Sequence, residues 1–359
     1  MIKFSPTSRT DFYSVLRSRI NTYFQLSKKS KFGGIQLIIK TIFLLSLFII
    51  PYVLILSGNF SLIAMLSLSG VMGLGVAGLG MAVMHDANHG TFSSNETITK
   101  IVGFCVYSLI IGGNPITWKI QHNILHHRYT NIYGADEDIE PYGALRFSPH
   151  ATHKTRFRYQ HIYSFIMYGL LTLVWALHKE FTQLSRYNRQ GLIKSNANYY
   201  KHLSILLIAK CFYFGYILVI PLMVLNITFT QWLIAFLFFH LVSGLVISVI
   251  FQMAHVVQEV ESPVLNDNGN IDNQWAVHQM QTTMNFAPKS RALFEFIGGL
   301  NYQIEHHLFP GISHIHYKKL APIVQQTAKE FGIPYHSHRT FFSAIKSHIY
   351  LMKSLGMAT

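Results

Sequence analysis

Long apolar segments alternate with polar, histidine-containing segments along this chain. Residues 36–57 and 61–84 form one closely spaced apolar pair, and residues 203–226 and 229–256 form a second. Each segment is long enough to cross the hydrocarbon core of a bilayer, which requires about 20 residues of α-helix. The pattern therefore predicts an all-α integral membrane protein with four transmembrane helices arranged as two hairpins.

The interiors of these segments support this interpretation. The second segment carries no charge and contains five glycines, which favour close helix packing in a membrane: Gly70, Gly73, Gly75, Gly78 and Gly80. Lys210 lies inside the third segment and leaves the start of that span open. Two shorter apolar stretches, 99–118 and 162–177, are predicted to be interfacial or buried helices. A spanning 99–118 would place the polar motifs on its two sides across the bilayer from each other.

Charge predicts the orientation of the spans. The chain has 29 basic and 15 acidic residues, a net charge of +14, but only 12% of its residues are charged. A soluble domain has about a quarter charged residues, so this balance favours a membrane over a nucleic acid as the partner of the basic surface. The turns within each hairpin lack Lys and Arg, whereas residues 1–35 and 146–201 are basic. The positive-inside rule therefore places both termini, 85–202 and 257–359 on the cytoplasmic side. We divide the chain into a basic N-terminal segment, 1–35, and a membrane domain, 36–359.

Three histidine clusters carry the candidate chemistry. They are His85-Asp-Ala-Asn-His89, His122-Asn-Ile-Leu-His126-His127 and Gln303-Ile-Glu-His306-His307. Histidines four residues apart lie on one face of a helix, so each cluster can direct two or three imidazoles at one point. Neutral imidazole suits iron, copper and zinc. With 20 histidines in 359 residues, an HxxxH pair is expected about once by chance, so the first cluster alone is weak. The ordered set beside predicted spans favours a metal site over histidines that only form interfacial hydrogen bonds.

At these residues the chain resembles the membrane fatty acid desaturase family, whose motif is HDxxH, then HxxxHH, then (H/Q)xxHH. Gln303 stands where most members have the first histidine of the third box, which is similar to front-end desaturases and bacterial linoleoyl-CoA desaturase-like proteins. The resemblance implies an O2-dependent oxidoreductase that inserts a cis double bond into an acyl chain at a histidine-ligated diiron centre in a cytoplasmic helical cap.

The resemblance also implies the ligands of the two irons. Carried over by motif, they are His85, His89, His122, His126, His127, Gln303, His306 and His307. The family has a further histidine at the cytoplasmic end of its last span, which is His255 here. Gln303 could bind iron through its oxygen or support a ligand from outside, and both roles stay open. Gln252, Asn301 and His314 are candidates to support the ligands in this way.

Other polar residues are less specific. Arg146, Lys154, Arg156 and Arg158 are candidates for the polar head of the substrate, although they could equally face anionic lipid headgroups. His278 is expected to be structural or to line a channel. The acidic run Asp136, Glu137, Asp138 and Glu140 is interpreted as a solvated turn.

The expected partners follow from the chemistry. The substrate is an acyl chain on CoA, a carrier protein or a phospholipid, and no nucleic acid is expected. The chain has no HPGG motif of a fused cytochrome-b5-like domain, so a separate ferredoxin or cytochrome b5 is expected to supply electrons. A related membrane hydroxylase, ketolase or sphingolipid-modifying enzyme stays an alternative. A metal transporter is a remote one, because that class carries ionisable residues inside its spans.

Overall fold

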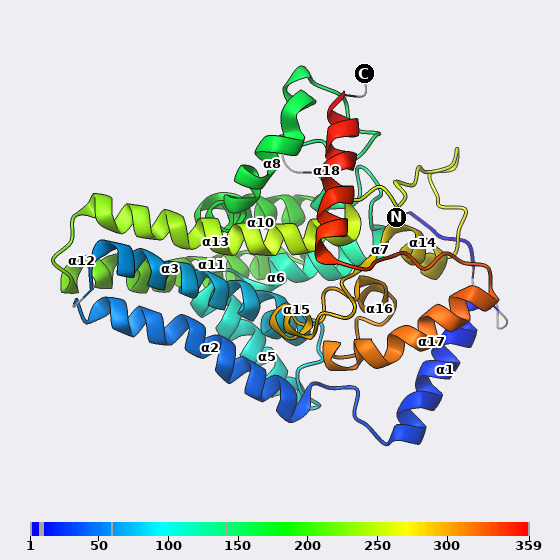
Figure 1. Ribbon diagram of the computed structural model, residues 1–359, viewed down its shortest axis with the longest axis horizontal. Helices are drawn as coiled ribbons and strands as arrows, with labels where there is room; N and C mark the ends of the chain where they lie inside the picture. Colours follow the sequence, from blue (N-terminus) through cyan, green and yellow to red (C-terminus); the bar gives the residue numbers. More distant parts are fainter. Residues whose placement is uncertain (1, 7–10, 59, 141–142, 358–359) are drawn as a thin grey trace. The chain divides into compact units, whose positions relative to one another are not determined.

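The computed structural model describes residues 2–6, 11–58, 60–140 and 143–357. They form two compact units: unit 1 comprises Met1–Gly34, Gln121–Ser164 and Val249–Thr359, and unit 2 comprises Ile35–Ile120 and Phe165–Ser248. Nearly all the regular structure is helical (Figure 1), and the strands β1 (Asn285–Phe286) and β2 (Ser337–His338) pair in parallel over two residues each. The predicted all-α class is confirmed.

Unit 2 contains most of the long apolar helices. Its helices are α2 (Gly34–Leu56), α3 (Leu62–Gly78), α4 (His85–Asn88), α5 (Glu96–Phe104), α6 (Pro115–Trp118), α9 (Leu171–Val174), α10 (Glu180–Arg189), α11 (Asn196–Phe214), α12 (Ile220–Val224) and most of α13 (Phe229–His255). Several are continued by π-helical segments, at Leu79–Met84, Cys105–Ile110, Trp175–Lys179 and Gly215–Val219.

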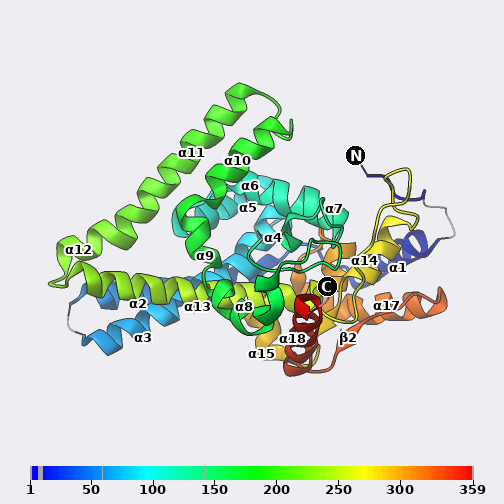
Figure 2. The same ribbon diagram turned by 90° about the horizontal axis from the view of Figure 1, so that it is seen from above.

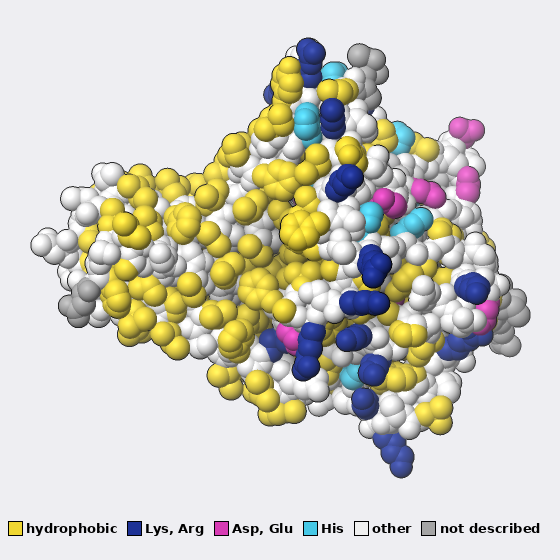
Figure 3. Space-filling view, in the orientation of Figure 1, with side chains coloured by type: hydrophobic (Ala, Val, Ile, Leu, Met, Phe, Trp, Pro, Cys, Tyr) yellow, Lys and Arg dark blue, Asp and Glu magenta, His cyan; other side chains and the backbone are white. Residues whose placement is uncertain are grey.

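Four continuous helical stretches in the described residues are long and apolar enough to cross a membrane. They are Gly34–Leu56, Leu62–Asn88, Asn196–Val224 and Phe229–His255. Large apolar side chains are exposed along them, for example Ile42 and Ile63, and Figure 3 shows apolar side chains covering the surface of α2 and α3. The four predicted spans are confirmed. The third begins at Asn196 because the Ser195 side chain caps it by accepting from the Asn198 N–H, a signal that hydropathy does not carry.

The two shorter apolar stretches form bent helix pairs. Glu96–Ile110 and Pro115–Tyr129 meet at 108°, and Thr155–Gly169 and Leu171–Arg189 meet at 53°. Gly112 in the first bend has a φ of +76°, and a Cβ there would lie 2.8 Å from Tyr213 Cβ. A glycine is therefore required at this turn. An interfacial or buried position for both stretches stays a prediction.

Glycines bring the apolar helices of unit 2 into backbone contact. A Cβ on Gly75 in α3 would lie 2.9 Å from the backbone of Leu47 and Phe48 in α2. A Cβ on Gly73 would lie 2.7 Å from the Phe239 carbonyl oxygen in α13. These approaches agree with the predicted packing role of the glycines in this segment.

Lys210, the one charge inside a predicted span interior, is neutralised within unit 2. Its ammonium lies 3.2 Å from Glu180 Oε2 and donates to the Trp175 carbonyl oxygen at 2.8 Å. Glu180 Oε1 also accepts from the Asn114 N–H and from the Thr117 hydroxyl, both at 3.1 Å. The pair joins α10 to α11, which lie side by side in Figure 2, and both side chains are buried. A buried ammonium without a partner would be strongly destabilising. The ion pair with Glu180 therefore explains how a lysine is accommodated inside this apolar helix.

Unit 1 consists of shorter helices. They are α1 (Phe12–Ser27), α7 (His127–Tyr129), α14 (Trp275–Thr282), α15 (Arg291–Phe296), α16 (Gln303–Leu308), α17 (Tyr317–Glu330) and α18 (Phe341–Met357), with 3₁₀ turns at Glu137–Ile139, Thr155–Tyr159 and His314–His316. Four helical segments cross the boundary between the units: α2, whose first residue Gly34 belongs to unit 1, the π-helical Lys119–His126, α8 (Gln160–Gly169) and α13.

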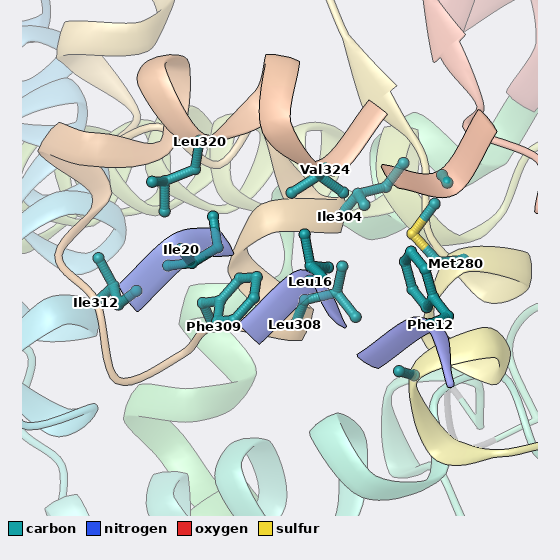
Figure 4. Packing of buried hydrophobic residues seen from close by; sticks show 12 residues of the cluster. Phe12, Leu16, Ile20, Met280, Ile304, Leu308, Phe309, Ile312, Leu320 and Val324 are labelled. Atoms are coloured by element: carbon teal, nitrogen blue, oxygen red, sulfur yellow. The ribbon is translucent and has the colours of Figure 1, made fainter. Parts of the chain in front are cut away.

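The core of unit 1 is built around α16. Phe12, Leu16 and Ile20 repeat every four residues on α1 and face a matching row on α17 that includes Leu320 and Val324 (Figure 4). Ile304 and Leu308 of α16 belong to the same cluster, and Figure 1 shows α1 beside α17. Burying this face fixes α16, so its remaining positions, including His306 and His307, are held in place. Residues 1 and 7–10 of the predicted segment 1–35 lie outside the described residues, and the division at residue 35 stays a prediction.

Candidate metal centre

Six histidines converge in unit 1. His122, His126 and His127 come from the π-helical segment Lys119–His126 and α7, His255 from the end of α13, and His306 and His307 from α16. All six are buried, each less than 10% exposed. The ring centroid of His307 lies 5.0 Å from that of His126, 4.4 Å from that of His127 and 4.9 Å from that of His255. Residues separated by up to 185 positions in the sequence therefore form one cluster.

A π-helix explains how the second box contributes to this cluster. Its hydrogen bonds join residues five apart, so positions i and i+5 lie above one another. His122 and His127 are five apart, and their Nε2 atoms lie 3.2 Å from each other. Two imidazole nitrogens bound to one ion at about 2.0–2.1 Å are about 2.8–3.4 Å apart at octahedral or tetrahedral angles. The sequence pattern predicted that histidines four apart share one helix face. In the second box, His122 and His127, which are five apart, also meet.

Within unit 1 the ligand atoms fall into groups of metal-binding size. His126, His255 and His307 form one group, and His127, His306 and His307 form another, with the ligand atoms of each group within 4.8 Å of one another. A third group joins His122 and His126 to Asp138. His307 belongs to both of the first two groups, so these groups overlap at one ligand.

The Nδ1 atoms of four of these histidines lie next to fixed polar groups. His126 Nδ1 lies 3.0 Å from Asp136 Oδ2, and His307 Nδ1 lies 2.8 Å from Gln279 Oε1. His255 Nδ1 lies 3.4 Å from the Thr282 carbonyl oxygen, and His306 Nδ1 lies 3.2 Å from the Tyr317 hydroxyl. Such partners fix the tautomer and the orientation of metal-bound imidazoles.

The Nε2 atoms of these rings show whether the cluster suits a metal ion. The Nε2 atoms of His126 and His255 are buried and have no hydrogen-bond partner among the described residues. Leaving a buried nitrogen unsatisfied is costly unless something else binds it. With Nδ1 held by an acceptor and Nε2 directed into the cluster, these residues fit a bound metal ion.

Asp136 corrects the interpretation of the acidic run as a solvated turn. Its carboxylate is fully buried and also accepts the backbone N–H groups of Asn131 and Asp138, at 2.9 and 3.0 Å. Burial raises the pKa of Asp136, whereas the His126 ring and these backbone donors lower it. The lowering effects together are the larger, so the pKa of Asp136 lies below its ordinary value. The 3₁₀ turn that follows, Glu137–Ile139, is acidic except for the buried Ile139, and this apolar residue is the feature that could have indicated a buried segment.

The first box lies in unit 2. The π-helical segment Leu79–Met84 leads directly into α4, and the rings of His85 and His89 have centroids 4.6 Å apart. Trp118 of α6 meets both rings edge to face, at 5.6 and 5.5 Å. The predicted pairing of these two histidines on one helix face agrees with this geometry.

The remaining predicted site residues of unit 1 differ in their surroundings. Gln303 begins α16, is 2% exposed, and its side chain interacts with His255. Gln252 is buried one turn before His255, and its Oε1 has no hydrogen-bond partner in the described chain. Asn301 is buried and donates to the Ala287 carbonyl oxygen at 3.2 Å. The ring of His314 packs against Phe294.

Two buried groups beside the cluster help to shape it. Burial lowers the pKa of His278 to about 4, so this ring is neutral, and it packs against Phe4. Burial raises the pKa of the Glu305 carboxyl to about 7, although hydrogen bonds from Asn285 and Tyr335 oppose this. Through these bonds Glu305 ties α16 to β1 and to the segment before β2.

The four head-group candidates differ from one another. Arg146 is buried, and its guanidinium donates to the carbonyl oxygens of Pro149, Ala151 and Leu355, each at 2.8 Å. This set of bonds gives Arg146 a structural role. Lys154, Arg156 and Arg158 are exposed, in or next to the 3₁₀ turn Thr155–Tyr159.

Together the fold and the site define a helical, multi-pass membrane protein with a buried histidine cluster that can hold metal. Residues 59–339 match the family model for fatty acid desaturases. The chain therefore belongs to the fatty acid desaturase family, and it is a membrane fatty acid desaturase, an oxidoreductase. This excludes the metal-transporter alternative.

Curated relatives agree with this assignment. The chain is 33% identical to a sn-1 linoleoyl-lipid 6-desaturase of Arthrospira platensis, over 96% of this chain and 93% of the relative. It is 32% identical to the enzyme of the same name from Synechocystis, over 100% and 98%. It is also 31% identical to an acyl-lipid (8-3)-desaturase of Physcomitrium patens, over 99% of this chain and 74% of that protein. The resemblance to the front-end subgroup is thereby supported.

Proposed function

We propose that this chain is a front-end acyl-lipid desaturase whose histidine cluster binds two irons. The observation that carries the proposal is the pair of three-histidine groups that share His307, with the Nε2 atoms of His126 and His255 directed into the cluster. Many imidazoles with few carboxylates suit a redox-active transition metal better than Mg²⁺ or Ca²⁺. Multi-electron chemistry on an acyl chain favours iron over zinc, which has no redox chemistry.

The overall reaction explains why a metal is needed. A –CH2–CH2– unit, O2, two electrons and two protons give –CH=CH– and two molecules of water. Two bound irons would supply the oxidising power for breaking unactivated C–H bonds, which no side chain acting as an acid or base can provide. The residues of this chain hold the ligands rigid through Asp136, Gln279 and Tyr317, and the buried surroundings exclude water from the cluster.

We assign the ligands from the motif together with the geometry of unit 1. His122, His126, His127, His255, His306 and His307 are the proposed imidazole ligands of this unit. Gln303 is proposed as an oxygen donor next to His255, since it is buried and interacts with that ring. The family motif adds His85 and His89, whose role as ligands is likewise a proposal. Gln252, Asn301 and His314 are proposed to support the ligands from outside.

The names of the relatives suggest the substrate. Two relatives are named for desaturating a linoleoyl lipid at position 6, and the third is named for acyl lipids. We therefore propose that this chain introduces a double bond between an existing one and the carboxyl end of a polyunsaturated acyl group, with position 6 as the first candidate. A complex lipid is proposed as the acyl carrier, and exposed Lys154, Arg156 and Arg158 as contacts for its anionic head.

The electron donor and the sidedness complete the proposal. A separate protein of the ferredoxin or cytochrome b5 type would supply the two electrons. The metal centre and both long polar segments are proposed to face the cytoplasm, which rests on the positive-inside distribution of Lys and Arg.

Fatty acid profiling in a host without desaturases tests this function. The chain is expressed with a ferredoxin system, linoleate is supplied, and total lipids are analysed by gas chromatography and mass spectrometry. We expect an 18-carbon product with double bonds at positions 6, 9 and 12, mainly in complex lipids. New bonds on the methyl side, or in saturated chains only, would contradict front-end desaturation. A hydroxylated product would contradict desaturation itself.

A further inference from the structure

Helix α18 has one exposed face of unusual composition for a helix in water. Its exposed large and charged residues are Phe342, Lys346, Tyr350, Lys353 and Met357. At 3.6 residues per turn these five positions fall within an arc of about 80°. Phe342 is 80% exposed, Met357 52% and Tyr350 48%. Large apolar side chains and lysines thus alternate along a single stripe.

The opposite face fixes how this stripe is presented. Ala344, His348, Met352 and Leu355 are buried in unit 1. The Leu355 carbonyl oxygen accepts from Arg146, and the Met352 carbonyl oxygen accepts from Gln160 Nε2 at 2.9 Å. His348 Nδ1 lies 2.6 Å from the Val256 carbonyl oxygen. The exposed stripe is therefore a defined surface of the folded unit.

The charged side chains of the exposed stripe are all basic, and the Glu259 carboxylate, which accepts from the Ser347 hydroxyl at 2.6 Å, lies against a buried position of α18 instead. Neither α18 nor the 3₁₀ turn Thr155–Tyr159 that packs against it contains Asp or Glu. Lys346, Lys353, Arg156 and Arg158 are exposed, and none forms an ion pair with a carboxylate of the described residues. The Lys346 ammonium lies 5.6 Å from the centre of the Tyr350 ring. Figure 3 shows basic and apolar side chains next to one another where α18 lies in Figure 1.

We propose that α18 is an interfacial helix whose exposed stripe lies on a membrane surface that contains anionic lipids. Apolar and aromatic side chains on a helix can enter the boundary between headgroups and acyl chains, while lysines between them reach lipid phosphates. Tyrosine is enriched at this depth, and basic residues are attracted to anionic headgroups. As a multi-pass membrane protein, the chain always has a bilayer as its neighbour. The proposal is independent of the metal and of the reaction.

Helix α17 provides a matched control within the same unit. It is also amphipathic, with buried Leu320 and Val324, but its exposed positions near the C-terminal end are polar: Gln325, Gln326, Lys329 and Glu330. A comparison of the two helices therefore separates an apolar, basic stripe from an ordinary solvated face.

Lipid quenching of a fluorophore tests the proposal. In the full chain with Cys105→Ser and Cys211→Ser, a single cysteine is introduced as Tyr350→Cys or, for comparison, Gln325→Cys, and labelled with bimane. Nanodiscs of phosphatidylcholine with or without phosphatidylglycerol carry lipids with a doxyl quencher near the headgroup. We expect quenching at position 350 to exceed that at 325 by about threefold or more, and to rise with anionic lipid.

Charge reversal on the stripe tests whether its lysines cause the response to anionic lipid. Lys346→Glu with Lys353→Glu is expected to remove most of the increase caused by phosphatidylglycerol, whereas Lys329→Glu on α17 leaves it unchanged. Met357→Cys replaces Tyr350→Cys as the label position if that variant does not fold. Equal quenching at 350 and 325 would overturn the proposal, as expected for a stripe that is solvated or occupied by an acidic protein. An unchanged anionic-lipid effect after charge reversal would overturn it as well.

Discussion

Replacing His307 by alanine is expected to reduce desaturation more than about 100-fold. Mutating a residue that only hydrogen-bonds to a metal ligand already costs about 10–100-fold in activity, and His307 is itself a proposed ligand. His307 belongs to two of the histidine groups, so its loss removes a donor from both. The variant should still enter the membrane, because the apolar helices of unit 2 do not involve this side chain. Product yield per mole of purified protein and metal content by mass spectrometry measure the effect.

His240→Asn is the control for loss of a buried histidine. His240 lies in α13 within unit 2, and its ring nitrogens lie 2.9 Å from the Tyr213 hydroxyl and 3.0 Å from the Thr172 hydroxyl. It belongs to none of the metal-sized groups. Loss of such a bond costs about 1–3 kcal/mol, so we expect a lower melting temperature with metal and activity retained. Wild-type metal and turnover in His307→Ala, or equal metal loss in both variants, would contradict the assignment.

Asp136→Asn should lower turnover by about 10–100-fold while leaving the chain folded. The change keeps the volume of the side chain and removes the charge that the His126 Nδ1–H faces at 3.0 Å. A neutral amide is a weaker acceptor, so His126 becomes a poorer donor through Nε2 and its tautomer is no longer fixed. Turnover, metal content and melting temperature are measured on the same preparation, together with the Mössbauer spectrum, which a purely structural role would not change.

Glu140→Gln makes the same chemical change four residues further along. Glu140 is exposed and accepts from the Gly134 N–H at 2.6 Å, away from the box histidines. We expect turnover within about twofold of wild type, as is usual for surface substitutions. If both variants lose activity equally, the turn as a whole is required, and the specific role of Asp136 is wrong.

The sequence predicted the features that depend on local pattern. Hydropathy located all four spans, since about 20 apolar residues have few other uses in a chain. The glycines of residues 61–84 indicated close packing, and Gly73 and Gly75 do bring α3 against the backbones of its neighbours. The box spacings predicted that the histidines of the second and third boxes lie together, because ligands of one metal need a fixed separation along a helix, and their role as ligands stays a prediction.

Features that depend on contacts across the chain were not predictable in this way. Asp136, Gln279 and Tyr317 meet their histidines only after folding, and no spacing in the sequence marks them. Residues 1–35 were interpreted only from their basic charge. The apolar repeat of Phe12, Leu16 and Ile20 at every fourth position could have indicated α1. Arg146 resembled a surface cation, but its guanidinium binds three backbone carbonyls inside unit 1.

The π-helical turns are also features that the sequence pattern did not predict. They precede His85 and carry most of the second box, and they replace an i→i+4 pattern by an i→i+5 pattern. Periodicity cannot distinguish the two patterns over six or eight residues. The structure resolves this because His122 and His127 approach through their Nε2 atoms. Such turns are frequent at functional sites, where they redirect side chains.

Metal stoichiometry of active protein tests the central claim most directly. The chain is produced in cells grown on iron-57, purified in detergent without chelators, and analysed for all transition metals, for its Mössbauer spectrum and for desaturase turnover. We predict about two irons per chain, in a spectrum of nitrogen- and oxygen-coordinated sites, with turnover that rises in proportion to iron content. Active protein that contains stoichiometric zinc, or only one iron per chain at full activity, would contradict the account.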